Sequence, residues 1–265
     1  MKISIFQMEI VPGNPSENLL KVHQWLEKEM AQNKPDLIVL PEMWTTSYTL
    51  EDIESHADDN GNTTIPFLQT LAKTFNVHIV GGSFANKIDG KVYNTAVVVN
   101  RYGEVVYTYN KVHLVPMLNE PNYLAGGQKV PEVFELDGIK MGLIICYDLR
   151  FPELIRPLAL EGAEVLFIVA EWPITRLHHW RNIQITRAIE NQMFVVSCNN
   201  VGSYGNDTFG GSSMVTNPWG DTLLEGSTDR EEVLSIAVNV EDTVEIRKKV
   251  PIFTSRVPHL YKQGL

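Results

Sequence analysis

Cys146 lies in sequence surroundings that suggest nucleophilic chemistry. It ends the apolar run 143–145, which is typical of a buried parallel strand, and Pro152 marks the first turn of the next predicted helix. A thiol at such a junction lies near the positive end of a helix dipole, which lowers its pKa and favours the thiolate. Asp148 is expected to cap that helix. Free cysteines are also often plain core residues, so this segment alone leaves both interpretations open.

Two other predicted strands end on side chains that can activate a thiol. Glu42 and Lys111 each follow an apolar stretch of the chain. Functional residues of α/β proteins gather beyond the carboxyl ends of strands. There Glu42 can take the thiol proton and return it to a leaving amine, while Lys111 and the backbone amide of Tyr147 can stabilise an oxyanion. Together with Cys146, these strand ends predict a nucleophilic site.

Strands and helices are predicted to alternate along the chain, which is what would position these side chains. The expected strands are 3–8, 36–41, 77–82, 93–100, 104–109, 139–146, 164–170, 194–198, 212–216, 221–224 and 233–238. The expected helices follow Ser16 and span 63–75, 151–161 and 176–191. The alternation predicts a single α/β domain over residues 1–265, with two sheets sandwiched between helices.

Composition and charge limit the class of protein. The 265 residues are 44% hydrophobic and 20% charged, as in an ordinary globular protein, and the formal net charge is −10. Without a basic stripe, the sequence favours neither nucleic acid nor an anionic membrane as partner. The start of the chain lacks a signal peptide pattern, and no apolar run approaches the ~20 residues of a membrane span. Two cysteines without CxxC spacing suit a reducing, cytoplasmic setting.

Three short blocks carry a resemblance to a known family. The blocks LPEMW (40–44), YNKVHL (109–114) and CYDLRFPE (146–153) resemble the signatures of the carbon–nitrogen hydrolase (nitrilase) superfamily, and the match runs from residue 3 to about residue 240. The resemblance implies an αββα sandwich, usually paired into a homodimer, and a catalytic triad of Glu42, Lys111 and Cys146. It also implies a second glutamate, Glu120, that positions the lysine or the substrate amide. The alternative for Glu120 is a solvated loop acid.

The segments AEWP (170–173), HWR (179–181) and TRAIEN (186–191) are similar to the omega-amidase type within that superfamily. Enzymes of that type hydrolyse the terminal amide of 2-oxoglutaramate and 2-oxosuccinamate. Such a substrate needs a cation for its distal carboxylate, and Arg150 is the candidate, with an ion pair to Asp148 or Glu153 as the alternative. Trp172 and Tyr147 are expected to line the pocket, and Trp44 is a weaker candidate for the same role.

The expected function is that of a thiol amidohydrolase that needs no cofactor and releases ammonia from a small carboxylate amide. N-carbamoyl-amino-acid and deaminated-glutathione amidases are the alternatives within the superfamily, and a non-catalytic binding protein on this fold is the alternative outside it. A papain-like mechanism would use His113 in place of Glu42. The seven histidines lack the spacing of a zinc site, and the paired glycines at 81–82 and 210–211 lack the GxGxxG spacing of a dinucleotide site.

Overall fold

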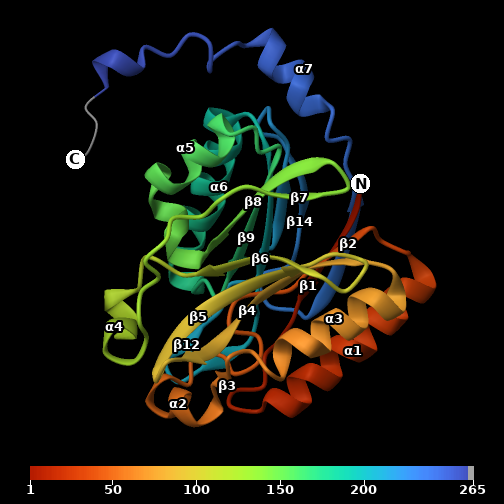
Figure 1. Cartoon of the computed structure of the whole chain (residues 1–265), viewed down its shortest axis with the longest axis vertical. Helices are drawn as coiled ribbons and strands as arrows, with labels where there is room; N and C mark the ends of the chain where they lie inside the picture. The colour runs from red at the N-terminus through yellow and green to blue at the C-terminus, as the bar shows by residue number, and fades with distance from the viewer. Residues whose placement is uncertain (262–265) are drawn as a thin grey trace.

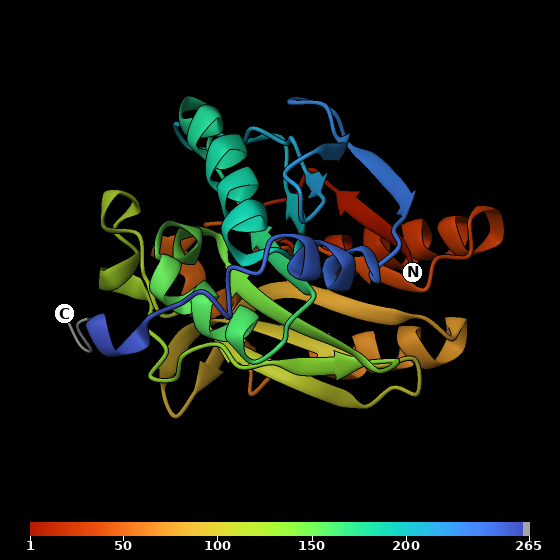
Figure 2. The ribbon, with the colours of Figure 1, turned by 90° about the horizontal axis from the view of Figure 1, so that it is seen from above.

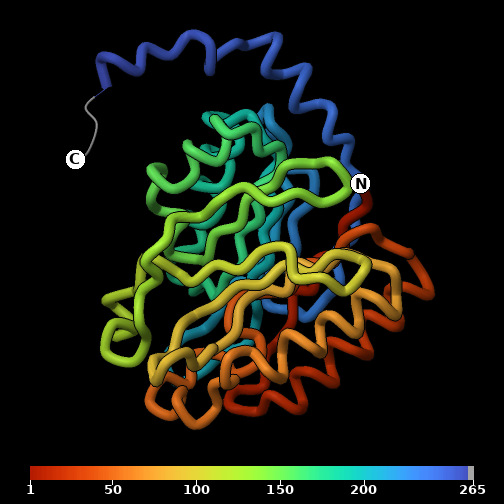
Figure 3. The backbone as a smooth tube through the Cα atoms, viewed as in Figure 1, coloured from red at the N-terminus to blue at the C-terminus, as the bar shows by residue number. Residues whose placement is uncertain are grey.

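Two β-sheets packed face to face form the centre of the molecule, and helices cover their outer sides (Figure 1, Figure 2). The structure is a computed structural model, and it describes residues 1–261. Beyond the last helix the chain runs across the top of the view in Figure 1, above the helices of the second sheet, toward the side opposite the N-terminus (Figure 3). Within residues 1–261, no helix is long and apolar enough to cross a membrane.

The first sheet has the strand order β15–β1–β2–β4–β5–β6, and the short β3 pairs with β4. Strands β1, β2 and β4 are parallel to one another, whereas β15, β5 and β6 pair antiparallel with their neighbours. The bounds are β1 Lys2–Gln7, β2 Leu37–Val39, β3 Asp58–Asp59, β4 His78–Ile88, β5 Lys91–Val99, β6 Val105–Asn110 and β15 Glu232–Ala237.

The second sheet has the order β14–β13–β10–β9–β8–β7, with β8, β9 and β10 parallel in its middle. The strands are β7 Phe134–Leu136, β8 Ile139–Ile145, β9 Val165–Ala170, β10 Phe194–Asn199, β13 Met214–Thr216 and β14 Thr222–Glu225. A separate small hairpin joins β11 Ser203–Tyr204 and β12 Asp207–Thr208. Parallel strands in the middle of each sheet direct several strand ends toward one region of the sandwich.

Helices α1 (Pro15–Gln32) and α3 (Thr64–Phe75) cover the first sheet, and α5 (Pro152–Leu160) and α6 (Leu177–Asn191) cover the second (Figure 1). The remaining helices are α2 Ile53–His56, α4 Glu120–Tyr123 and α7 Asp242–Lys249. Apolar residues of α1 recur at helical spacing, so that Val22 and Leu26 are buried against the sheet.

Alternating side chains of the first sheet supply both of its packed faces. In β2, Leu37 and Val39 belong to the core shared with the second sheet, whereas Ile38 packs in the layer below α1 and α3. The predicted α/β sandwich is thus confirmed. One difference lies in β4 and β5: the sequence predicted separate strands over 77–82 and 93–100, whereas in the structure β4 continues to Ile88 and forms a hairpin with β5. The hairpin extends past the β-bulge between Val80 and Ser83.

Candidate active site

The structure brings the predicted Glu42, Lys111 and Cys146 together beyond the ends of three strands. Glu42 follows β2, Lys111 comes directly after β6, and Cys146 comes directly after β8. Glu120, at the start of α4, joins the same cluster. All four are buried, with Cys146 the most accessible at 5% exposure. Three ionisable side chains and a thiol are therefore enclosed in a volume from which water is largely excluded.

The two carboxylate oxygens of Glu42 have different surroundings. Oε1 accepts hydrogen bonds from Tyr48 Oη at 2.7 Å, Asn94 Nδ2 at 2.8 Å and Lys111 Nζ at 2.9 Å. Oε2 accepts from the backbone amide of Glu171 at 2.8 Å. A carboxylate has about four acceptor positions, two on each oxygen. Oε1 is therefore fully used, and Oε2 is the oxygen that can still take a proton.

All three N–H groups of the Lys111 ammonium donate hydrogen bonds inside the cluster. Its Nζ donates to Glu42 Oε1, to Glu120 Oε1 at 2.8 Å and to Tyr48 Oη at 3.1 Å. Burial alone would lower the pKa of Lys111, but the charges of Glu120 and Glu42 outweigh it and raise the pKa well above the usual range. Glu120 Oε2 in turn accepts from the backbone amide of Val115 at 2.8 Å. Lys111 is thus a fixed positive charge, and Glu120 is a structured member of the cluster rather than a solvated loop acid.

Cys146 has an unusual backbone conformation and a thiol whose surroundings disfavour the thiolate. Its φ of 44° lies in the left-handed region, and it is the first residue of the 3₁₀ turn Cys146–Arg150, with α5 beginning only at Pro152. Burial raises the pKa of the thiol well above its usual range, and the charge of Glu42 raises it further, whereas Lys111 lowers it. The sequence-based expectation of a lowered pKa is wrong. The longer helix starts six residues later, and burial with two nearby carboxylates outweighs the one cation.

Asp148 does not cap α5, which corrects a second expectation. Its carboxylate accepts from Tyr109 Oη at 2.8 Å and from the backbone amides of His113 at 3.0 Å and Ile145 at 3.3 Å. His113 Nδ1 also lies 2.9 Å from Asp148 Oδ1, and its ring stacks on Phe151 at a centroid distance of 3.5 Å. These contacts engage His113 outside the cluster, and they leave Asp148 no free oxygen for Arg150.

Arg150 lies against the predicted pocket residues Trp172 and Tyr147. Its guanidinium carbon is 4.7 Å from the Trp172 ring centre and 5.7 Å from that of Tyr147. Among residues 1–261, no carboxylate lies within ion-pair distance of it. Its Nε is buried without a hydrogen-bond partner in that range, and its terminal nitrogens reach only His179 Nδ1, at 3.4 and 3.5 Å. Arg150 is thus a partly buried cation without a counter-ion in the described chain, and the expected alternative pair with Asp148 or Glu153 does not form.

Trp44 belongs to the core and not to the pocket. It is 0% exposed, donates through Nε1 to the carbonyl of Gly81 at 2.8 Å and packs near Phe67 of α3. Its side chain therefore points into the layer between the first sheet and the helices. It lies two positions after Glu42, so its backbone is next to the site while its ring faces the helix layer.

Three residues of the cluster were missed from the sequence. Asn94 is a buried amide in β5, close to the apolar run 96–99 of the same strand, which is a usable signal. Glu171 directly follows β9, as Cys146 follows β8, so the strand-end argument could have found it. Tyr48 lies in the irregular segment after Glu42, and nothing in its sequence surroundings marks it.

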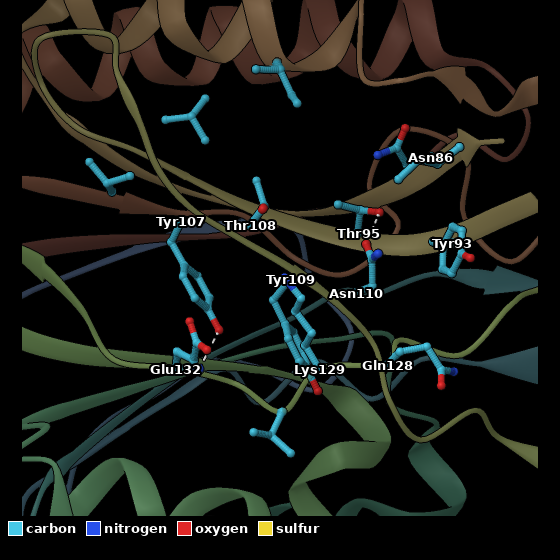
Figure 4. Close-up of a pocket in the computed structure, with 15 residues that line it drawn as sticks. Asn86, Tyr93, Thr95, Tyr107, Thr108, Tyr109, Asn110, Gln128, Lys129 and Glu132 are labelled. Carbon is cyan, nitrogen blue, oxygen red and sulfur yellow. Dashed lines mark hydrogen bonds between the residues drawn. The ribbon is translucent and has the colours of Figure 1, made fainter.

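A groove of about 750 Å³ lies elsewhere, along the open part of β5 and β6 and the segment around Gln128 (Figure 4). Figure 4 shows Thr95 bonded to Asn110, and Tyr107 bonded to the backbone of Glu132, inside this groove. None of the predicted site residues lines it. Within residues 1–261, no group of three or more His, Cys, Asp or Glu side chains is placed to hold a metal ion. We therefore assign the candidate site to the Glu42 cluster.

The chain is similar to known proteins over almost its whole length. Residues 2–248 match the family model of the carbon-nitrogen hydrolases. A Staphylococcus aureus protein called "Hydrolase in agr operon" is 43% identical over 263 residues, which cover 99% of this chain and 100% of that protein. The 2-oxoglutaramate amidase of Bacillus subtilis (strain 168) is 42% identical over 259 residues, which cover 98% of each chain.

The fold is also that of a solved member of the superfamily. A CN-hydrolase superfamily protein from Xanthomonas campestris, with an arsenic adduct in its active site, gives a TM-score of 0.90 at 28% identity. The likeness covers 100% of this chain and 99% of that one. These likenesses confirm the resemblance carried by the three sequence blocks. The chain belongs to the carbon–nitrogen hydrolase family, and it is a hydrolase of carbon–nitrogen bonds.

Proposed function

We propose that the protein is a thiol amidase that releases ammonia from the terminal amide of a small carboxylate such as 2-oxoglutaramate. The observation that carries the proposal is the pairing of a buried Glu42–Lys111–Cys146 cluster with the cation of Arg150, which has no carboxylate partner among residues 1–261. The name of the Bacillus subtilis relative supports the substrate class.

The first step uses a thiol that is neutral in the free enzyme. As the sulfur of Cys146 attacks the amide carbon, its proton moves to Glu42 Oε2, the oxygen with a free acceptor position. A carbon–sulfur bond forms, and the electron pair of the carbonyl moves to its oxygen. The charge of Lys111 and the amide of Tyr147, at the start of a 3₁₀ turn where amides have no intrahelical partner, stabilise that oxyanion.

Collapse of the oxyanion breaks the carbon–nitrogen bond. Glu42 gives its proton to the departing nitrogen, ammonia leaves, and a thioester on Cys146 remains. Glu42 then takes a proton from a water molecule that attacks the thioester. The thiolate leaves as the new carboxylic acid forms, and the proton on Glu42 returns to sulfur. No cofactor enters either half of the cycle.

Arg150 is proposed to bind the distal carboxylate of the substrate. Its guanidinium stacks on Trp172, which is itself held by hydrogen bonds from Nε1 to the carbonyl of Arg176 at 2.9 Å and from its amide to Asn199 at 2.6 Å. A guanidinium fork recognises a carboxylate through two parallel hydrogen bonds. A tryptophan held through both its backbone amide and its ring nitrogen keeps that fork in one orientation.

Ammonia release from a substrate panel tests the proposal. The panel contains 2-oxoglutaramate, glutaramate, N-carbamoyl amino acids and deaminated glutathione, each with the wild type and Cys146→Ala. We expect turnover of the first compound and its loss in Cys146→Ala, with an unchanged circular dichroism spectrum. Turnover of the carbamoyl compounds alone, or of deaminated glutathione alone, would reassign the substrate. Ammonia release that persists in Cys146→Ala would refute the thiol mechanism.

The expected homodimer stays a prediction of the family resemblance. Light scattering of the purified protein measures it directly. A molecular mass near that of one 29.9 kDa chain would contradict it.

A further inference from the structure

Glu171 is a buried acid to which the proposed reaction cycle gives no role. It follows β9, is 1% exposed and touches the site in two ways. Its backbone amide holds Glu42 Oε2, the oxygen proposed to carry the proton. Its side chain accepts hydrogen bonds from Ser47 Oγ at 2.9 Å and Asn200 Nδ2 at 2.8 Å. Glu171 therefore connects the segment that carries Glu42 to the ends of β9 and β10.

The hydrogen bonds of the Glu171 side chain identify where a proton would lie. Both donors, the hydroxyl of Ser47 and the amide of Asn200, reach Oε1. Oε2 is buried and has no hydrogen-bond partner among residues 1–261. An ionised carboxylate with one bare, buried oxygen would lose its hydration without compensation. A protonated acid with its carbonyl at Oε1 and its hydroxyl at Oε2 fits these contacts.

The charge of the cluster leads to the same protonation state. Glu42 and Glu120 already place two negative charges around the one positive charge of Lys111. An ionised Glu171 would add a third carboxylate in a region without solvent, where charges interact strongly. Burial raises the pKa of Glu171 well above its usual range, and the charge of Glu42 raises it further, against the opposing effects of the Ser47 hydrogen bond and of Lys111.

We propose that Glu171 is a protonated positioning residue that fixes the acceptor oxygen of Glu42 and the segment around Ser47. Two backbone positions in that segment, Met43 and Ser47, have φ values of 45° and 54°. Such left-handed residues need outside contacts to stay in place. The Ser47–Glu171 hydrogen bond is one such contact, and Tyr48, which donates to Glu42, is the next residue along the chain.

Neutrality is what lets Glu171 do this beside a nucleophile. When Cys146 loses its proton to Glu42, the negative charge moves from a carboxylate to sulfur and the net charge of the cluster stays the same. An ionised Glu171 would oppose the thiolate and would compete with Glu42 for the proton. The advantage of a neutral Glu171 beside the thiolate rests on the proposed amidase chemistry, but the protonation state of Glu171 can be measured without turnover.

Infrared difference spectra between the wild type and Glu171→Gln measure the protonation state. We expect a carbonyl stretch of a protonated carboxylic acid in the wild type at neutral pH, absent from Glu171→Gln. The exposed Glu245→Gln is the matched control and should leave the band in place. Absence of the band at neutral pH would show an ionised Glu171 and overturn the proposal. Because this readout needs no substrate, it stands even if Cys146→Ala refutes the thiol mechanism.

Kinetics with three variants and one control variant measure positioning. Glu171→Gln keeps a carbonyl for Ser47 and Asn200, so we expect kcat within about threefold of wild type and an unmoved acid limb of the pH profile. Glu171→Ala should lower kcat by about 100-fold with little change in KM. If Glu171→Ala does not fold, Ser47→Ala should lower kcat by about five- to tenfold, whereas the exposed Ser55→Ala should not.

The kinetic outcomes that contradict the proposal are equally specific. Wild-type kcat in folded Glu171→Ala, or in Ser47→Ala, would remove the positioning role. An acid limb displaced to lower pH in Glu171→Gln would mean that Glu171 carries a negative charge in the wild type. A neutral Glu171 rules out that displacement, because replacing it by an amide changes no charge facing Glu42, Lys111, Glu120, Tyr48 or Cys146.

Discussion

The Glu42 cluster and Arg150 differ in how their charged groups are partnered within the candidate site. In the cluster, every donor of Lys111 has an acceptor, and two carboxylates surround one cation. At Arg150, a cation rests on aromatic rings with no carboxylate beside it in the described chain. The difference separates two tasks. The groups that must keep their geometry during bond cleavage form hydrogen bonds to other protein groups. Arg150, which is proposed to bind the substrate, leaves hydrogen-bond donors available for the substrate carboxylate.

Replacing Lys111 by Met should give the largest effect on stability and activity, because it removes the only cation of the Glu42–Lys111–Glu120 cluster. The change leaves Glu42 and Glu120 facing each other without a cation, and breaking a buried pair costs about 3–5 kcal/mol. Urea unfolding measures this loss, and ammonia release should vanish with it. Two buried carboxylates repel more as they ionise, so the loss of stability should grow as pH rises.

The exposed pair Lys87–Glu54, at 2.8 Å, provides the matched control for that change. Lys87→Met removes the same side chain from a solvated setting, and it should leave the unfolding midpoint nearly unchanged. Equal losses in Lys87→Met and Lys111→Met would show that burial of the cluster has no energetic weight.

Replacing Glu42 by Gln should lower kcat by about 10²- to 10⁴-fold, since the amide cannot accept the thiol proton. The amide nitrogen would also meet the amide of Glu171 where Oε2 stood. The measurement is steady-state ammonia release, with folding checked by circular dichroism. A papain-like mechanism through His113 predicts instead that most activity survives. His113→Ala distinguishes the two from the other side, because it should retain turnover under the Glu42 mechanism.

Arg150→Leu should raise KM for a carboxylate-bearing amide by about 10- to 100-fold, since hydrogen bonds to a charged group are worth about 1.5–3 kcal/mol. We expect a neutral amide of the same length to be turned over equally by both proteins. That pair of substrates is the control for any distortion of the pocket. An equal rise in KM for both amides would assign Arg150 a structural role and not a role in carboxylate binding.

Glu42→Gln should lower kcat but increase the reactivity of the Cys146 thiol, and this second effect should be smaller. Burial raises the pKa of Cys146, and the charge of Glu42 raises it further. Removing that charge should lower the thiol pKa, and each unit of pKa corresponds to about a tenfold change in thiolate near neutral pH. Iodoacetamide labelling, with Cys146 resolved from the buried Cys198 by peptide mass, should therefore be faster in Glu42→Gln. Slower labelling would contradict the assigned electrostatics.

Strand-end reasoning predicted three members of the cluster because each lies at the end of a predicted strand, whereas Glu120 was predicted only from the family resemblance. Glu42, Lys111 and Cys146 are these three residues, and the structure brings them together. The predicted lowering of the Cys146 pKa was wrong because the local sequence indicates a helix dipole only. The burial of the thiol and the carboxylates near it arise from residues that are distant in sequence. The role of Tyr48 and the contacts of Asp148 could not be predicted from the sequence for a similar reason. They depend on long-range contacts with β6 and with the loop after it.

The left-handed backbone of Cys146 has a practical consequence for trapping bound substrate. A residue with a β-carbon at a φ of 44° carries a cost of about 1 kcal/mol that glycine avoids. An inactive Cys146→Ala protein inherits that cost, whereas Cys146→Gly relieves it. We therefore expect the glycine variant to melt at a higher temperature than the alanine variant, which would make it the better protein for crystallising a complex with an intact amide.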